Sequence, residues 1–261
     1  MLYLYAITDR PATPMPNGFA PIGPDGCDPH PYTLVYQDIA AVISPVTAPR
    51  VPPTESNVWR HEAVLEALMV ERAVLPLRFG SVLPDVDAVR AVLSARYVDF
   101  VASLRRVCGR VEMGLRVLDT SEAGSWKSEV VRHPVPDGGP EEKGRAYLLT
   151  RLEEERRNRG SRQRAEALAT EIHATVVRLA VESVVQRLVT PRLLLTAAYL
   201  VERERAAVFR KEVEHLIAVY PALRFLCTGP WPPYNFVASD TMPDARVLLH
   251  RSSRENANGY S

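Results

Sequence analysis

Hydrophobic and polar residues alternate along the first hundred positions in two distinct ways. Short runs of β-branched and aromatic residues are typical of strands, whereas Val58, Leu65 and Leu68 recur at helical spacing. Pro84, directly before Asp85, favours the start of a second helix. The pattern predicts strands over Met1–Thr8, Tyr32–Tyr36, Ile39–Ser44 and Val74–Leu83, and helices over Asn57–Ala73 and Asp85–Cys108.

The rest of the chain repeats this alternation but contains one much longer helical pattern, Lys143–Leu188. Its second half carries Ile172, Val176 and Val184 at helical spacing. A break is expected near Asn158–Gly160, where charge is densest and a glycine intervenes. The pattern predicts strands over Arg110–Leu118, Arg192–Val201 and Leu223–Cys227, and helices over Lys143–Leu188 and Glu204–Tyr220.

Three segments fall outside this alternation and mark the organisation of the chain. Arg10–Pro31 is rich in proline and predicts an irregular surface loop. Asp119–Glu142 is polar, with several glycines and prolines, and is predicted to be a mobile loop. Residues 238–261 are rich in Ser, Arg and Asn and are predicted to form a flexible tail. We therefore expect an N-terminal domain over residues 1–108 and a C-terminal domain over residues 109–237.

The order of predicted elements indicates an α+β protein made of two consecutive α/β sandwiches. Each set combines a few strands with two helices, which favours helices packed on one face of a small sheet. A ferredoxin-like arrangement is the favoured topology for both domains. The second domain would be a modified version, because it contains the long helical section.

Composition excludes several classes of function. Hydrophobic residues make up 46% and charged residues 24%, a balance typical of globular proteins. The formal net charge of +1 provides no field for nucleic acid or anionic membranes. Cys27, Cys108 and Cys227 are too widely spaced for a zinc site or a disulfide framework. Because no apolar run resembles a signal peptide or a membrane span, we expect a soluble cytoplasmic protein.

Candidate chemistry is sparse. None of the six histidines has the i, i+4 spacing of a helical zinc site. His61 and Glu62 are adjacent and are expected on different helix faces, with the histidines exposed or partly buried. Glycine-rich phosphate loops and nucleophile elbows are missing, while a pair of carboxylates assembled in space stays open. We expect no enzyme activity, no catalytic residue, no cofactor and no metal.

Two groups of arginines have alternative interpretations. The segment Arg151–Arg164 has six arginines and three glutamates, so it is either a solvated helix with i, i+4 pairs or a helix that docks a partner. Arg78 lies between Leu77 and Phe79 on a predicted strand. It either faces water by alternation, the favoured interpretation, or is buried against a carboxylate as a structural clamp.

The stretch Gly229–Val237, GPWPPYNFV, follows the last predicted strand. Its prolines exclude a helix or a central strand. A stiff segment with Trp231, Tyr234 and Phe236 suits either a buried strap or a contact surface. We expect it to fold back and lock the end of the second domain.

Two motifs together resemble the GvpF/GvpL family of gas vesicle proteins. The segments LPLRFG and GPWPPYNFV are specific in combination, and the resemblance extends over most of residues 1–237. The order of the other parts agrees: YLYAIT ending at Thr8, HEAVLEALM from His61, LPLRFG from Leu75, GRAYLL from Gly144 and GPWPPYNFV from Gly229.

The resemblance implies an accessory protein of the gas vesicle, a gas-filled organelle with a protein shell. It implies two α+β domains, contact with the shell protein GvpA and other accessory gas vesicle proteins, and an association with the vesicle. A small-molecule-binding regulator or enzyme with a pocket between the domains is the alternative, and a nucleic-acid module ranks third. The motif residues expected to bind partners or to stabilise the fold are Arg78, Phe79, Gly80, Gly229, Pro230, Trp231, Pro232, Pro233, Tyr234, Asn235 and Phe236.

Overall fold

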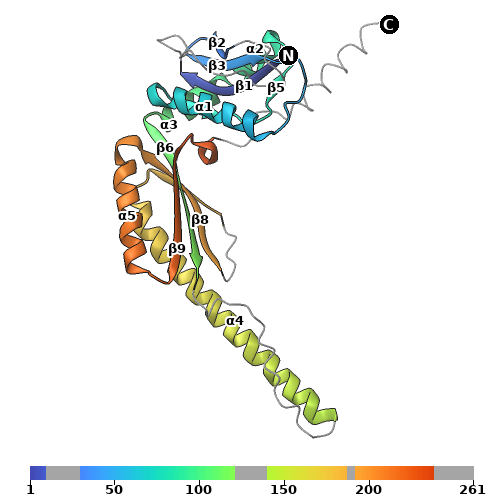
Figure 1. The fold of residues 1–261 in the computed structure, drawn as a ribbon, viewed down its shortest axis with the longest axis vertical. Helices are drawn as coiled ribbons and strands as arrows, with labels where there is room; N and C mark the ends of the chain where they lie inside the picture. The colour runs from blue at the N-terminus through green and yellow to red at the C-terminus, as the bar shows by residue number, and fades with distance from the viewer. Residues whose placement is uncertain (10–29, 121–139, 187–191, 238–261) are drawn as a thin grey trace. The chain divides into compact units, whose positions relative to one another are not determined.

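The structure, a computed structural model, describes residues 1–9, 30–120, 140–186 and 192–237 (Figure 1). These residues form two compact units. The first contains Met1–Glu112 and the described residues from Gly229 onward, and the second contains Met113–Thr228. The aromatic stretch, which we grouped with the second domain, is therefore part of the first unit here. The expectations for the proline-rich loop, the mobile loop and the tail concern residues that lie almost entirely outside the described ones.

An antiparallel sheet forms the centre of the first unit, with strand order β2-β3-β1-β4 and the short β5 also paired with β1. The predicted strand Val74–Leu83 is two short strands, because the chain turns between them at Gly80, whose φ is +86°. The strands are β1 (Leu2–Asp9), β2 (Tyr32–Tyr36), β3 (Ile39–Pro45), β4 (Val74–Pro76) and β5 (Val82–Leu83).

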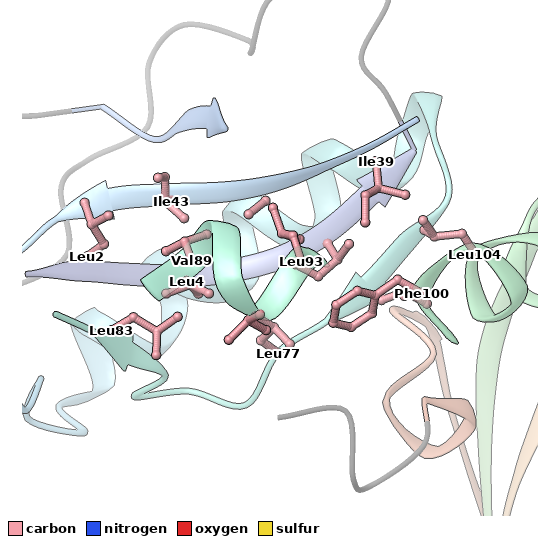
Figure 2. Close-up of a cluster of buried hydrophobic side chains, with 14 of the residues drawn as sticks. Leu2, Leu4, Ile39, Ile43, Leu77, Leu83, Val89, Leu93, Phe100 and Leu104 are labelled. Carbon is pink, nitrogen blue, oxygen red and sulfur yellow. The ribbon is translucent and has the colours of Figure 1, made fainter. Parts of the chain in front are cut away.

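Helices cover both faces of this sheet. Leu2 and Leu4 of β1 join a buried apolar core with α2 (Val86–Ala95) and α3 (Tyr97–Val107). Side chains alternate along a strand, so Tyr3 points to the other face, where it contacts α1 (Glu55–Glu71). The expectation that helices pack on one face of the sheet is therefore wrong for this unit. Figure 2 labels ten residues of the core: Leu2, Leu4, Ile39, Ile43, Leu77, Leu83, Val89, Leu93, Phe100 and Leu104.

The region predicted as one helix over Asp85–Cys108 is divided at Arg96 into α2 and α3. Arg96 adopts φ −120° and ψ 19°, outside the helical range, so the chain changes direction there. The Asp85 side chain accepts a hydrogen bond from the Ala88 amide at 2.8 Å, which caps the start of α2. The break lets two short helices, rather than one long one, follow the twisted sheet.

The second unit has the ferredoxin-like order of elements, βαββαβ. Its sheet has strand order β7-β8-β6-β9, which is the strand order of that fold. The two-domain α+β fold predicted from the sequence is confirmed. The elements are β6 (Arg110–Asp119), α4 (Pro140–Val177), β7 (Glu182–Gln186), β8 (Leu193–Glu202), α5 (Ala206–Val219) and β9 (Leu223–Trp231).

The long helical pattern ends earlier than predicted. α4 stops at Val177, and the following residues Glu182–Gln186 form β7, which pairs antiparallel with β8. Val184 and Val185, placed in a helix by their spacing, lie opposite Ala198 and Ala197 of β8. The expected break near Asn158–Gly160 is also wrong, since α4 is helical throughout.

The core of the second unit lies between its sheet and both of its helices, α4 and α5. Tyr199 of β8 is fully buried, with its ring centroid 5.6 Å from His173 of α4 and 5.2 Å from Phe209 of α5. Among the α4 residues whose side chains the structure describes, the buried ones lie in the C-terminal part, and the first half of the helix extends beyond the sheet of its own unit (Figure 1).

Candidate functional site

The two family motifs meet on the α1 face of the first sheet, around a buried histidine. We call this group the His61 cluster; it comprises Tyr3, Tyr5, His61, Glu62, Phe79 and Tyr234. Tyr3 and Tyr5 of β1 lie on the same face because side chains alternate along a strand, and their ring centroids are 5.0 Å apart. The pairing of β1 with β3 shifts between Leu4 and Ala6, so Ile7, three residues after Leu4, joins Leu2 and Leu4 in the core on the other face.

Hydrogen bonds fix the orientation of the His61 ring. Its Nε2 lies 3.2 Å from the Leu77 carbonyl oxygen, which can only accept, so we assign the proton to Nε2. Nδ1 then accepts from the Tyr3 hydroxyl at 2.9 Å. The same hydroxyl accepts from the Gly80 amide at 3.2 Å. A continuous chain of bonds thus joins β1, α1 and the turn of the LPLRFG motif.

Tyr234 extends this chain to the second motif. Its hydroxyl lies 3.3 Å from His61 Nε2 and donates to Glu62 Oε1 at 2.8 Å. Its partners lie 173 and 172 positions away in the sequence. Tyr234 is therefore the side chain through which GPWPPYNFV binds α1.

Aromatic contacts enclose the cluster. The Tyr5 ring stacks on His61, with centroids 5.7 Å apart and an interplanar angle of 16°. Phe79 meets both Tyr3 and His61 edge to face, at 6.0 and 5.8 Å. Such pairs add roughly 0.5–1.5 kcal/mol each beyond area burial. His61 is therefore surrounded by rings and has no exposed surface.

Burial shifts the pKa of every titratable group in this cluster. It lowers the pKa of His61 to about 4, so the ring is neutral near pH 7. It raises the pKa of Tyr5 to about 12 and raises the pKa of Tyr3 still further. Burial, and then the neighbouring Glu62, raise the pKa of Tyr234, while burial raises the pKa of Glu62. Near neutral pH the cluster is suited to holding hydrogen bonds rather than exchanging protons.

A second carboxylate binds the residue after Tyr234. Glu112 is buried in β6 and accepts from the Asn235 backbone amide at 2.8 Å and from its side-chain Nδ2 at 2.6 Å. Burial raises the pKa of Glu112, and both bonds from Asn235 oppose that rise. Phe236 is also buried, so hydrogen bonds hold Tyr234 and Asn235, and apolar burial holds Phe236.

The aromatic stretch therefore folds back, but not where we expected. The hydrogen bonds of Tyr234 and Asn235 go to α1 and to Glu112, all within the first unit, whereas Gly229–Trp231 form the end of β9. The physical reason is the position of the two carboxylates: half-buried Glu62 and buried Glu112 need donors, and Tyr234 and Asn235 supply them. The Gly229–Pro230 peptide bond is cis.

The predicted motif residues divide into buried and exposed groups. Arg78 is exposed, so it faces water and is not a buried clamp. Phe79 is partly buried, and Gly80 contributes its amide to Tyr3. In the second motif the buried residues are Pro232, Pro233 and Phe236, the partly buried ones Gly229 and Tyr234, and the exposed ones Pro230, Trp231 and Asn235.

Sequence reasoning missed the centre of the cluster. His61 was expected to be exposed or partly buried, and it is fully buried. A signal was present: Leu65 and Leu68 follow His61 at i+4 and i+7, so all three lie on one face of α1. The second unit repeats the arrangement, because His173 Nδ1 lies 2.8 Å from the Tyr199 hydroxyl and burial lowers the pKa of His173.

Two further features of the described residues bear on the type of site. No group of three or more His, Cys, Asp or Glu within the described ranges could hold a metal ion. Among the described helices, none combines the length and the apolar character that crossing a bilayer requires.

Comparisons with known proteins agree with both motifs. A family model described as gas vesicle synthesis protein GvpL/GvpF matches residues 1–238. Gas vesicle protein L of Streptomyces sp. (strain CB03234) is 34% identical over 255 residues, covering 90% of this chain and 91% of that protein. Gas vesicle protein F2 of Halobacterium salinarum is 25% identical over 209 residues, covering 79% of each.

The fold is also similar to solved structures. The crystal structure of gas vesicle protein GvpF from Anabaena sp. PCC7120 matches with a TM-score of 0.71 at 22% identity, covering 90% of this chain and 95% of that one. GvpF from Microcystis aeruginosa matches with a TM-score of 0.68 at 20% identity, covering 90% and 98%. These likenesses concern the fold.

Proposed function

Because the chain belongs to the gas vesicle synthesis protein GvpL/GvpF family, we propose that it is a non-enzymatic assembly factor that binds the shell protein GvpA and other accessory gas vesicle proteins. It acts in the cytoplasm and associates with the growing shell. Shell subunits that polymerise through apolar surface need a partner that covers this surface beforehand. Apolar contact supplies most of the stabilisation in such a complex.

The different exposure of the three aromatic residues in GPWPPYNFV supports this proposal. Tyr234 is bound to Glu62, and Phe236 is buried. Trp231 is 39% exposed and lies next to this fixed segment. A tryptophan held on a rigid segment loses little conformational entropy on binding, and tryptophan is enriched among the residues that dominate binding energy. We propose that Trp231 contacts the shell protein.

Co-purification tests this contact. The full chain with an affinity tag is co-expressed with GvpA, and the amount of GvpA retained is compared among wild type, Trp231→Ala and Tyr32→Ala. Tyr32 is a matched control, since it is also aromatic and 39% exposed. We expect Trp231→Ala to reduce retained GvpA roughly tenfold or more, as for a central interface tryptophan, and Tyr32→Ala to retain it.

The outcome that contradicts the proposal is equally defined. Circular dichroism first establishes that both variants are folded. A wild-type chain that retains no GvpA would refute direct shell binding, and equal retention by both variants would refute the role of Trp231. Deletion of the gene in a vesicle-forming host, scored by electron microscopy, tests the assembly role itself. Intact vesicles in normal number would overturn it.

A further inference from the structure

The outer face of α1 carries an exposed apolar stripe. Trp59, Ala63 and Val70 are spaced at i, i+4 and i+11 and so lie on one side of the helix. The Trp59 side chain is 63% exposed and Val70 is 71% exposed. The Trp59 indole Nε1 donates to Glu55 Oε1 at 3.5 Å, which holds the ring against the first turn of α1. A large apolar surface presented in this way indicates an interaction site.

The helix that carries this stripe is acidic, although Glu62 is bound to Tyr234 and Glu71 lies 4.0 Å from Arg72 Nη2. Within Glu55–Glu71 there are four glutamates and one arginine, and His61 on the opposite face is neutral. Glu66 lies within the stripe, between Ala63 and Val70, and is exposed. The outer face of α1 therefore combines apolar contact with negative charge.

The first half of α4 carries a second exposed apolar surface. Leu148 is 62% exposed, and Leu149 and Leu152 are also exposed, as is Tyr147. Leu148 and Leu152 are one turn apart on the same side of the helix. The buried residues of α4 all come from its C-terminal part, so nothing in the described part of the second unit covers these leucines.

A basic segment follows this patch. Residues 140–164 contain eight Lys and Arg and five Glu, and the excess of positive charge comes from residues 156–164. Arg151 pairs with Glu154 at 3.8 Å, and the next turns, 156–164, contain arginines without any acidic residue. An apolar patch is thus followed by a strongly basic segment on a helix that extends beyond its own sheet.

We propose that the first half of α4 in one copy of this chain docks on the α1 stripe of a second copy. The leucines Leu148 and Leu152 would cover Trp59 and Ala63, and the arginines after them would lie near the glutamates of α1. Contact between two α1 stripes would bring acidic surfaces together, and contact between two α4 segments would bring basic surfaces together. Complementary charge therefore favours the contact between unlike surfaces.

This contact has a geometric consequence. Each copy has one α1 stripe and one α4 segment. Two copies that exchange these surfaces reciprocally form a closed dimer, whereas two copies joined by a single contact keep one free surface of each kind and continue into rings or open chains. Because two single helices bury a small area, the contact is at the weak end of protein interfaces, and we expect it at micromolar concentrations and above.

Sedimentation of the purified full chain, without any shell protein, tests the proposal independently of the proposed function. We expect the weight-average mass of the wild type to rise from that of a monomer to that of a dimer or a larger assembly between about 1 and 200 μM, and to fall back in high salt. The double variants Trp59→Ser with Val70→Ser, and Leu148→Ser with Leu152→Ser, should each stay monomeric. All four side chains are exposed, so folding should be preserved. Val98→Ser, an exposed apolar position on α3, is the matched control and should associate like the wild type.

Mixing the two double variants provides the decisive measurement. One retains an intact α4 segment and the other an intact α1 stripe, so an equimolar mixture should form one-to-one dimers and nothing larger. A wild type that is monomeric at all concentrations would overturn the proposal. A mixture that stays monomeric would also overturn it. If the variant Trp59→Ser with Val70→Ser still associated alone, the contact would be between two α4 segments, and the proposal would again be overturned.

Discussion

Replacing His61 by glutamine should remove an acid-induced loss of stability from the first unit. His61 is buried and neutral, donates to the Leu77 carbonyl and accepts from Tyr3. The glutamine amide also supplies one donor and one acceptor, but it does not titrate. The substitution thus separates the proton equilibrium of His61 from its hydrogen bonds.

The pKa of His61 sets the size and the sign of the effect. In the folded protein this pKa is about 4, against 6.5 for an unperturbed histidine. Between these values the unfolded chain binds a proton that the folded chain does not, so acid favours unfolding. Stability from neutral His61 is complete above pH 6.5 and is lost as the pH falls toward 4. The loss is about 2 kcal/mol at pH 5 and about 3 kcal/mol at pH 4.

Two carboxylates in the same unit act in the opposite direction. The pKa values of Glu62 and Glu112 are raised by burial, so folding becomes more favourable for these groups as the pH falls through this range. They are present in both proteins and cancel in the comparison. The useful quantity is therefore the difference between the wild type and His61→Gln, and not the pH dependence of either alone.

Urea denaturation at intervals from pH 4.5 to 7.5 measures that difference, and hydrogen exchange of the α1 amides confines it to the first unit. We expect the wild type to lose about 2 kcal/mol more than the variant between pH 7.5 and pH 5. Two pH profiles that stay parallel within about 0.5 kcal/mol would refute the argument that His61 is buried in its neutral form.

Three further substitutions test particular contacts. Tyr234→Phe should lower the stability of the first unit by about 1.5–3 kcal/mol. A double-mutant cycle with Glu62→Gln should show coupling, and additive losses of stability would contradict the hydrogen bond between Tyr234 and Glu62. A Cβ on Gly114 would lie 2.6 Å from Thr228 Oγ1, so Gly114→Ala should destabilise the second unit by about 1–3 kcal/mol. Adding Thr228→Ala should relieve part of this loss. A stability unchanged by Gly114→Ala would show that the site accommodates the methyl group. Asp85→Ala should cost about 1 kcal/mol in thermal unfolding through loss of the α2 cap, whereas Asp85→Asn should cost little.

A continuous apolar run was sufficient to predict a strand that is buried on both faces. Ile39–Ser44 was predicted as a strand, and β3 spans Ile39–Pro45 with all but its last residue buried. Arg78 was likewise predicted to face water, because its neighbour Leu77 is apolar and must point inward. In both cases neighbours along the chain determine the environment, so local pattern carries the information.

The failures occurred where partners come from distant segments. Val184 continues the helical spacing of Val176, but its pairing with Ala198 decides that it lies in a strand, and no local pattern reveals this pairing. The hydrogen-bonding partners of His61 come from β1, from the turn after β4 and from residue 234. Its helix face was predictable from Leu65 and Leu68, whereas the identity of these partners was not.

The order in which the units are completed follows from the path of the chain. Tyr234 and Asn235 bind carboxylates that precede them by 172 and 123 positions, and all residues of the second unit lie in between. During synthesis on the ribosome, which proceeds from the N-terminus, the second unit is therefore complete before the first has received its last segment. Until then, Glu62 and Glu112 lack the donors that satisfy them in the finished protein. A nascent chain halted before Tyr234 should expose α1 and its surroundings to proteases and chaperones, and release of the remaining residues should close this region.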